Sequence, residues 1–568
     1  MSLGGSLQIG RSGLLTSQAA LDTVGHNLAN LATRGYHRQS VSLSPSDSQR
    51  ISQNVAVGRG VQIDAITRQV DEALQGRLRT AIAEEAGASQ HEELLRRLEA
   101  IEHEFSDADL TTQLGRFFDA WNQLADNPQD SSLRSLVTRQ GQQLADFVQD
   151  LRQQMVGLRR QSEEAASAAA RQVNELMEDI ADLNRKIAVH EGGGGGTAGL
   201  RDQRDRALNE LAEYLDISTV TQSNGQVDVY VGSEPLVLNG KSRGVELLRE
   251  NVDGQTVQRL VVADDGTQLN ATAGKLGALV SFRENDMAEA IDTLDRFAHE
   301  LIWHVNRQHS QGQGLALRES ITAEHRVADT DVPLNDPAAG LAFVPEHGSF
   351  RLHVTQESTG ERKTHIIDID LDGIDSDSDT TLHSLAGTID AIANVTASVT
   401  ADGRLEIATA DSDHKLSFSE DTSGVLAALG MNSYFTGHDA NDIAVRNELA
   451  RTPGLLAAAQ DHTAGDNTNA AAIAQLRHES SDDIAGLSLS EYWNRHVEEY
   501  GARLAAASER VVASGTVRQS LEQQQQSVSG VNVDEEAIDL IRYQRAYQAS
   551  ARFLSVVDEM MKTLLQSL

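Results

Sequence analysis

The chain has 568 residues, which is enough for several domains at roughly 150 residues each. Its 84 acidic and 48 basic residues give a net charge of −36, which argues against nucleic acid or an anionic membrane as partner, because both need a basic surface. The absence of cysteine excludes disulfides, thiolate metal sites and cysteine nucleophiles.

No targeting or membrane segment is evident. The sequence holds no run of 18 apolar residues, so we expect no membrane insertion. The first residues lack the basic and apolar regions of a cleaved Sec signal. By signal alone we expect a cytoplasmic protein, unless it leaves the cell by a route that needs no cleaved signal.

The N-terminal segment, residues 1–75, begins with an apolar heptad. Leucine recurs every seventh position, and a second register falls between these positions. Such a 3-4 alternation predicts one helical stripe that needs a partner helix, because an uncovered apolar stripe in water is unfavourable. The turn-forming residues 30–35 end this helix, and extended segments follow. The two registers are Leu7, Leu14, Leu21 and Leu28, then Gly10, Ser17, Val24 and Leu31.

Helical periodicity dominates residues 76–335, which we expect to form a helical core domain. One helix should end at the glycine run Gly192–Gly196, which no helix tolerates. Another helix is predicted over 200–215, where LRDQRDRALNEL places carboxylates and arginines close together; we expect ion pairs along the helix surface rather than acid–base chemistry. A small strand region near 217–262 should include a hairpin at Asn224-Gly225.

Residues 336–436 alternate apolar and polar positions and predict an α+β outer insertion domain. FRLHVTQ and THIIDIDL flank turn residues and predict one hairpin, and Asp402-Gly403 predicts a second, with a short helix at 382–395 between them. The helical core domain returns over 437–526.

The C-terminal segment, residues 527–568, carries the second heptad after an acidic helix start at 534–536. The fold class is therefore mainly α with α+β insertions, and the two terminal helices pair as a coiled coil. Periodicity alone favours pairing within one chain over pairing between chains. The registers are Leu540, Tyr547, Leu554, Met561 and Leu568, then Tyr543, Ser550, Val557 and Leu564.

No motif indicates an enzyme or a cofactor. The acidic run at 368–379 resembles half of a calcium loop, but its twelfth residue is Asp379 rather than glutamate and a strand precedes it, so we expect no metal there. His304 and His309 lie five residues apart, which is poor ligand geometry on a helix and favours a structural role. The glycine run lacks the Lys-Ser/Thr that follows a phosphate-binding loop.

Both ends resemble the bacterial flagellar axial proteins, the family of rod, hook and hook-associated proteins. HNLANLATRGYHRQ at 26–39 and VNVDEEAIDLIRYQRAYQASARFL at 531–554 are similar to the family's terminal signatures. Arg34 departs from the family's usual proline. Segments 200–215, 429–445 and 465–476 narrow the resemblance to the hook–filament junction members. The signature residues are Asn27, Ala29, Asn30, Thr33, Gly35, Tyr36, Asn532, Asp534, Glu536, Gln544 and Tyr547.

The resemblance implies a structural function. Such proteins form a ring of subunits between the hook and the filament, through terminal helices that then pack between subunits, and they contact the hook protein and a second junction protein. They are exported through the type III apparatus without a cleaved signal, and a chaperone covers the C-terminal helix. On this basis the assembly interface comprises Leu7, Leu14, Leu21, Val24, Leu28, Leu31, Leu540, Tyr543, Tyr547, Leu554, Val557, Met561, Leu564 and Leu568.

Two alternatives remain open at this point. A secreted adhesin or binding protein would use the insertion at 336–436, with or without calcium, but it has no need of the terminal signatures. Another axial subunit, of hook or rod, would share the ends but not the internal segments.

Overall fold

The computed structural model describes residues 3–52, 55–103, 109–192, 196–252, 255–374, 379–460, 463 and 465–567. The chain divides into two compact units. Unit 1 comprises Met1–Leu94, Gln161–Glu284 and Leu504–Leu568, and unit 2 comprises Leu95–Arg160 and Asn285–Arg503. Three long helices contribute residues to both units, namely α2 (Glu72–His103), α4 (Ser131–Gly192) and α12 (Leu489–Ser529).

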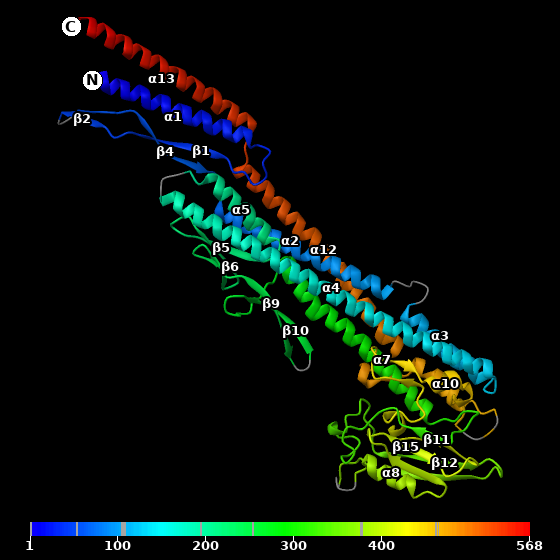
Figure 1. Ribbon diagram of the computed structural model, residues 1–568. Coiled ribbons are helices and arrows are strands. Elements are labelled where there is room, and N and C mark those ends of the chain that lie inside the picture. The colour runs from blue at the N-terminus through cyan, green and yellow to red at the C-terminus, as the bar shows by residue number, and fades with distance from the viewer. Residues whose placement is uncertain are drawn as a thin grey trace. The chain divides into compact units, whose positions relative to one another are not determined.

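The two terminal helices belong to unit 1. Helix α1 (Leu3–Ala29) and helix α13 (Val533–Ser567) lie side by side and antiparallel (Figure 1). Helix α13 starts where Asn532 accepts a hydrogen bond from the Asp534 N–H, and its first turn is acidic, which suits the positive end of the helix dipole.

A two-stranded ribbon follows α1 and runs along it. Strand β1 (Gln39–Pro45) pairs antiparallel with β4 (Val61–Arg68), with a bulge between Ser42 and Leu43. A shorter pair, β2 (Gln49–Ser52) and β3 (Val55–Val57), extends the ribbon.

The rest of unit 1 is built on helices α5 (Ala198–Ala212) and α6 (Gly274–Ser281) and on parts of α2, α4 and α12. A π-helical turn at Phe282–Asp286 has residues in both units. Leu74, Leu78 and Ala81 of α2 pack with Leu521 of α12. The strands are β5 (Ile217–Thr221), β6 (Val227–Val231), β7 (Glu234–Leu238), β8 (Lys241–Ser242), β9 (Val245–Val252) and β10 (Gln255–Val262).

The hairpin predicted at Asn224-Gly225 is present. Strands β5 and β6 pair antiparallel around it, and Gly225 adopts φ +80°, a left-handed conformation that favours glycine. Likewise α4 ends at Gly192, where the glycine run begins; Gly193–Gly195 lie outside the described residues.

Unit 2 combines helices with an α+β block. Helix α3 (Leu110–Asp126) and helix α7 (Met287–Ser310) carry its helical core, where Phe117 and Trp121 pack against Tyr434. A 3-10 turn at Pro337–Ala339 lies between β11 (Ser320–Thr322) and β12 (Gly348–Gln356). The smaller elements late in the unit are α9 (Val425–Ala428), β17 (Phe435–Thr436), β18 (Ala444–Val445), α10 (Asn447–Arg451), α11 (Thr468–Gln475), β19 (Ser480–Ser481), β20 (Leu487–Ser488) and 3-10 turns at Pro453–Leu455, Leu476–His478 and Asp482–Ile484.

The α+β block contains two three-stranded sheets, ordered β13-β12-β16 and β11-β15-β14. The apolar alternate residues of β12, Phe350, Leu352 and Val354, are buried, as the alternating pattern predicts, and the intervening His353 and Thr355 are buried too. Both predicted hairpins, β12–β13 and β14–β15, are present. The elements are β11 (Ser320–Thr322), β12 (Gly348–Gln356), β13 (Arg362–Ile369), α8 (Leu382–Asp390), β14 (Val395–Val399), β15 (Leu405–Thr409) and β16 (His414–Ser419).

The predicted fold class is confirmed: the chain is mainly helical, its ends are paired helices, and a β-containing block interrupts the helical core. Among the described residues, none of the helices combines the length and the apolar character that crossing a membrane requires.

Candidate functional site

Helix α13 turns its heptad stripe toward α1. The stripe is half-buried along the helix and fully buried at Val557, whereas most residues between its positions are exposed. The covered positions are Leu540, Tyr543, Tyr547, Ser550, Leu554, Val557 and Met561. Leu564 is 45% exposed, and Leu568 lies outside the described residues.

Helix α1 meets this stripe through small residues. A Cβ atom at Gly10 would lie 2.7 Å from Leu554 Cγ, and one at Gly13 would lie 2.8 Å from Ser550 Oγ. Both distances are shorter than ordinary packing allows, so a side chain at either position would push the helices apart. Glycine at these two positions therefore permits the close approach of α1 and α13. Ser17 is also buried.

The leucine register of α1 is less covered than the small-residue register. Val24 is buried, but the predicted leucines are only half-buried, and Leu31 lies beyond the end of α1 and is 48% exposed. The half-buried leucines are Leu7, Leu14, Leu21 and Leu28.

A buried polar hub joins the two terminal signatures. Asn27 and Glu536 are each 1% exposed, and the Asn27 amide nitrogen donates to Glu536 Oε2 at 3.0 Å and to the Gln39 carbonyl at 2.9 Å. The Asn27 Oδ1 atom accepts from the Tyr36 hydroxyl at 2.7 Å and from the Gln39 N–H at 3.0 Å. Asn27 therefore uses both of its polar side-chain atoms to join α1 and α13 to residues 30–39, the segment that follows α1, which we call the connecting segment.

The hydroxyl of Tyr36 serves as a hydrogen-bond donor in this hub. Burial, together with the carboxylates of Asp202 and Glu536, raises the pKa of Tyr36 to about 12. The phenol therefore stays protonated at neutral pH and keeps its bond to Asn27.

Arg38 provides the charge that Glu536 needs. Its Nε donates to Glu536 Oε1 at 2.7 Å, and its Nη1 donates to Glu535 Oε2 at 2.6 Å. Its backbone N–H donates to the Ser529 carbonyl, and its carbonyl accepts from the Gln69 N–H. Sequence reasoning did not select Arg38; the signal available was a basic residue within the N-terminal signature segment at 26–39, in a strongly acidic chain.

The remaining signature residues shape the two turns. Asn30 donates to the His26 carbonyl and accepts from the Thr33 hydroxyl, which closes the end of α1. Gly35 adopts φ +76°, and a Cβ atom there would lie 2.6 Å from Arg206 Cγ, so the position requires glycine. Ala29, Thr33, Asn532, Asp534 and Gln544 are exposed.

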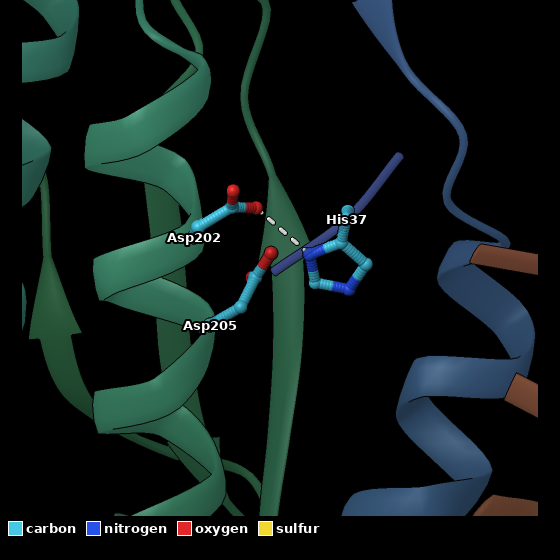
Figure 2. A group of neighbouring side chains, drawn as sticks. All are labelled: His37, Asp202 and Asp205. Carbon is cyan, nitrogen blue, oxygen red and sulfur yellow. Dashed lines mark hydrogen bonds and ion pairs between the residues drawn. The ribbon is translucent and has the colours of Figure 1, made fainter. Parts of the chain in front are cut away.

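A second cluster fastens the connecting segment to the core of unit 1. Figure 2 shows His37 facing Asp202 and Asp205 of α5, and its Nδ1 lies 2.8 Å from Asp202 Oδ1. The Nε2 atom of His37 lies 3.2 Å from the Gln75 side-chain nitrogen of α2. All of these side chains are buried.

Two arginines neutralise the carboxylates of this cluster. Arg68 Nη1 donates to Asp202 at 2.7 Å and to Asp205 at 2.8 Å, and Arg79 Nη2 donates to Asp205 at 3.2 Å. His37, Asp202 and Asp205 have the donor types and spacing of a metal site. However, Arg68 and Arg79 already occupy both oxygens of Asp205 and one oxygen of Asp202, so the donor set fits an ion-pair network rather than a cation.

Electrostatics favour the charged state of Asp205. Burial alone would raise the pKa of this carboxyl, but the guanidinium groups of Arg68 and Arg79 outweigh burial and hold it below its usual value. Burial lowers the pKa of the neighbouring Arg204 to about 10, so this guanidinium remains charged at neutral pH.

The prediction of surface ion pairs along LRDQRDRALNEL is wrong for its central residues. Asp202, Arg204 and Asp205 are buried, with exposed fractions of 6%, 3% and 8%. Asp202 and Asp205 pair with side chains of other segments, and Arg204 donates to Asn184 and to the Gly225 carbonyl. Spacing along one helix cannot reveal partners that lie far away in sequence.

The acidic run at 368–379 begins in the last two residues of strand β13 and continues beyond the end of the strand. Asp368 and Asp372 are exposed, and Asp370 lies 3.3 Å from His347 Nδ1. Residues 375–378, at the centre of the run, lie outside the described residues.

The two histidines noted on the sequence lie on α7. His309 is fully buried; its Nδ1 contacts the Asn432 carbonyl at 2.7 Å and its Nε2 accepts from the Ala457 N–H at 3.0 Å. Burial lowers the pKa of His309 to about 3, so the ring is neutral and links segments of unit 2. His304 lies 3.3 Å from Glu300.

Two family models match the chain. One, described as the flagellar hook-associated protein FlgK helical domain, matches residues 95–319. The other, described as the flagellar basal body rod FlgEFG protein C-terminal, matches residues 522–567.

One relative matches over almost the full length and another over about half of this chain. Flagellar hook-associated protein 1 of Escherichia coli strain K12 is 25% identical over 98% of both chains, and that of Bacillus subtilis strain 168 is 27% identical over 54% of this chain and 67% of its own. The fold is similar to the flagellar hook junction protein FlgK of Burkholderia pseudomallei, with a TM-score of 0.51 and 16% identity over 80% of this chain and 100% of that chain. The chain is therefore similar over almost its full length to flagellar hook-associated protein 1, and its helical part matches the model of the hook-associated helical domain.

Proposed function

We propose that this chain is a structural component of the bacterial flagellum that forms the junction ring between hook and filament. Copies of the chain assemble through the paired terminal helices α1 and α13. Full-length similarity to hook-associated protein 1 of Escherichia coli and of Salmonella typhimurium supports this function.

The observation that carries the proposal is the buried bond between Asn27 and Glu536. These residues come from opposite ends of the chain, and each belongs to a segment that resembles an axial-protein signature. Their meeting in one hub builds a single assembly module from the two ends. The hydrogen bonds of Asn27 fix the alignment of α1, the connecting segment and α13.

The partners follow from this function. The ring contacts further copies of the chain, the hook protein on one side and a second hook–filament junction protein on the other. Before export through the type III apparatus, without a cleaved signal, a chaperone covers the stripe of α13. The mature protein resides outside the cell in the flagellum.

The half-covered stripe of α13 suits this route. Ordering a helix costs about 1–2 kcal/mol per residue in backbone entropy, and burial at assembly offsets this cost. Only part of that burial is available within one chain, because most stripe residues remain half-buried. Neighbouring copies of the chain supply the remaining burial of α13.

The match of residues 95–319 to a hook-associated helical domain favours the junction over a hook or rod position. No described feature of the insertion favours an adhesin, and the proposed function involves no catalytic step.

The test is deletion of the gene and complementation with the full chain. We expect the deleted strain to keep its hooks, to lack filaments and to release filament subunits into the medium. Antibody against this chain should label the tip of the hook in the complemented strain. Normal filaments after deletion, or label along the length of the hook, would refute the proposed position.

A further inference from the structure

Helix α13 has a second apolar face that α1 does not cover. Ile538, Ile541, Val556 and Met560 are 67%, 50%, 54% and 55% exposed. Ile538 and Ile541 are three residues apart, Val556 and Met560 are four apart, and Ile538 and Val556 are separated by five helical turns. All four therefore lie on one side of α13, away from the stripe that meets α1. Phe553, 43% exposed, lies at the edge of this outer stripe.

The outer stripe also carries positive charge. Arg545 and Arg552 fall on the same side of α13 and are exposed, and within the described chain neither makes an ion pair. In a protein with a net charge of −36, an apolar stripe with two such arginines is unusual, and it fits an apolar surface that carries carboxylate.

The β1–β4 ribbon has an apolar face of its own. In the antiparallel register Val41 lies opposite Ile66, and Leu43 lies opposite Ile63, so these four side chains share one face. Leu43, Ile63 and Ile66 are 44%, 40% and 47% exposed. The opposite face presents Ser40, Ser42, Ser44, Gln62, Ala65 and Thr67.

The ribbon needs a cover, and it carries an acidic group. A two-stranded ribbon is marginally stable in water by itself, and an exposed apolar face adds to the cost. Asp64, the extra residue at the bulge beside Ile63, is exposed and makes no ion pair with the described residues.

The two surfaces lie on different sides of α1. Helix α13 packs on one side through Gly10 and Gly13, and the ribbon lies along another, where Ser12 accepts from the Val61 N–H (Figure 1). One module therefore presents an apolar and basic helix stripe at one edge and an apolar and acidic ribbon face at the other.

We propose that the outer stripe of α13 in one copy docks on the ribbon face of the next copy, residues Val41, Leu43, Ile63 and Ile66. The stripe from Ile538 to Met560 rises about 33 Å, whereas the seven residues of β1 span about 23 Å, so the ribbon covers part of the stripe.

The contact joins two different surfaces, so it is head-to-tail and can close into a ring, whereas a self-complementary contact would stop at a dimer. This inference rests on the proposed function and adds to it which surfaces meet between copies.

The absence of cysteine makes crosslinking a direct test. One full-length variant carries Ile66→Cys and a second carries Val556→Cys, and both are expressed together in the deleted strain. Flagella are sheared, oxidised mildly and analysed on non-reducing gels. We expect interchain dimers that contain one chain of each variant. The matched control replaces Ile66→Cys by Ser42→Cys, on the opposite face of the same ribbon, and should leave the chains unlinked.

Three results overturn the inference: dimers of Val556→Cys with itself, equal crosslinking by Ser42→Cys, or no crosslinking on flagella that carry normal filaments. Failure of the wild-type chain to restore filaments would instead refute the proposed function, so the two failures are distinguishable. Melting curves of each purified variant check that the cysteines leave the fold intact.

Discussion

Glu536 accepts a hydrogen bond from the side chain of Asn27, 509 positions earlier in the chain, and both side chains are almost completely buried. The same carboxylate also accepts from Arg38. A buried carboxylate is destabilising unless charged and polar groups bond to it. Sliding α13 along α1 would separate the Glu536 carboxylate from its partners and would therefore destabilise the pair of helices. The hub therefore sets the alignment of the two ends, and the small residues of α1 allow their close approach.

Replacing Asn27→Ala should loosen the terminal helices without unfolding the core. The change removes the bonds to Glu536, Gln39 and Tyr36 and leaves buried polar groups unsatisfied, at a cost of about 1–3 kcal/mol. Hydrogen exchange on the purified protein should accelerate over 3–30 and 535–560. The control is Gln544→Ala, an exposed signature residue on α13. Unchanged exchange in Asn27→Ala would show that the hub does not hold the ends together.

A cysteine pair can decide whether the ends pair within one chain. A Cβ atom at Gly13 would lie 3.6 Å from Ser550 Cβ, and disulfides have Cβ–Cβ distances of about 3.5–4.5 Å. We expect Gly13→Cys with Ser550→Cys to form an intramolecular disulfide in the monomer, seen as faster migration on a non-reducing gel. Dimers without an intramolecular product would mean that the ends are exchanged between copies.

The buried network around Asp205 should stabilise unit 1 strongly. Asp205→Asn removes one carboxylate from Arg68 and Arg79, and an unpaired buried charge costs about 3–5 kcal/mol. Chemical denaturation at pH 7 should show the loss. Asp182→Asn, which breaks exposed pairs with Arg185 and Lys186 on a helix surface, should leave the midpoint unchanged.

The same carboxyl predicts an acid dependence. The pKa of Asp205 is lower in the folded protein than its ordinary value of 3.8. Its contribution is therefore fully present above that value and is lost as the pH falls below it, through the folded pKa. The difference between the original chain and Asp205→Asn should narrow below pH 3.8. A difference that stays constant down to that range would contradict the assignment.

The acidic run at 368–379 should not bind calcium at micromolar concentration. A strand precedes it, and its twelfth position, Asp379, is mostly buried rather than free to act as a bidentate ligand. Calorimetric titration should show no tight site. A single tight site that disappears in Asp368→Ala would disprove this expectation and strengthen the case for a ligand-binding insertion.

Local patterns in the sequence predict much of the fold. The hairpin at Asn224-Gly225 and the end of α4 at Gly192 follow from residues next to one another. The heptad positions of α13 from Leu540 to Met561 are half-buried or buried, because helical periodicity alone determines which side chains share a face.

Contacts between distant segments do not follow from such patterns. His37 and Arg68 reach Asp202 from segments more than a hundred residues away, and no periodicity encodes that meeting. For the same reason the sequence predicts Asp205 to be a surface residue, whereas the structure buries it. On α1 the leucines dominate the pattern, whereas Gly10 and Gly13 make the closest approach, because a small residue gives no hydrophobic signal.

The last prediction concerns the seam between α13 and α1. Leu554 lies against Gly10, and Met561 is half-buried one heptad later. Replacing both by aspartate places two charges against apolar surface, which costs several kcal/mol if they remain ionised. The cores of the two units use other residues, so the main melting transition should stay near that of the original chain. We expect a variant that is exported but forms no junction, so that hooks remain bare and filament subunits appear in the medium.

The matched control is Gln548→Asp with Ser555→Asp, which adds the same charge at exposed positions of α13 that belong neither to the seam nor to the outer stripe. This control should support normal filaments. Electron microscopy of sheared flagella and a blot of the medium distinguish the two variants. Because both carry equal added charge on the same helix, a difference between them isolates the seam. Normal filaments with Leu554→Asp and Met561→Asp would show that pairing of α13 with α1 is not required for assembly.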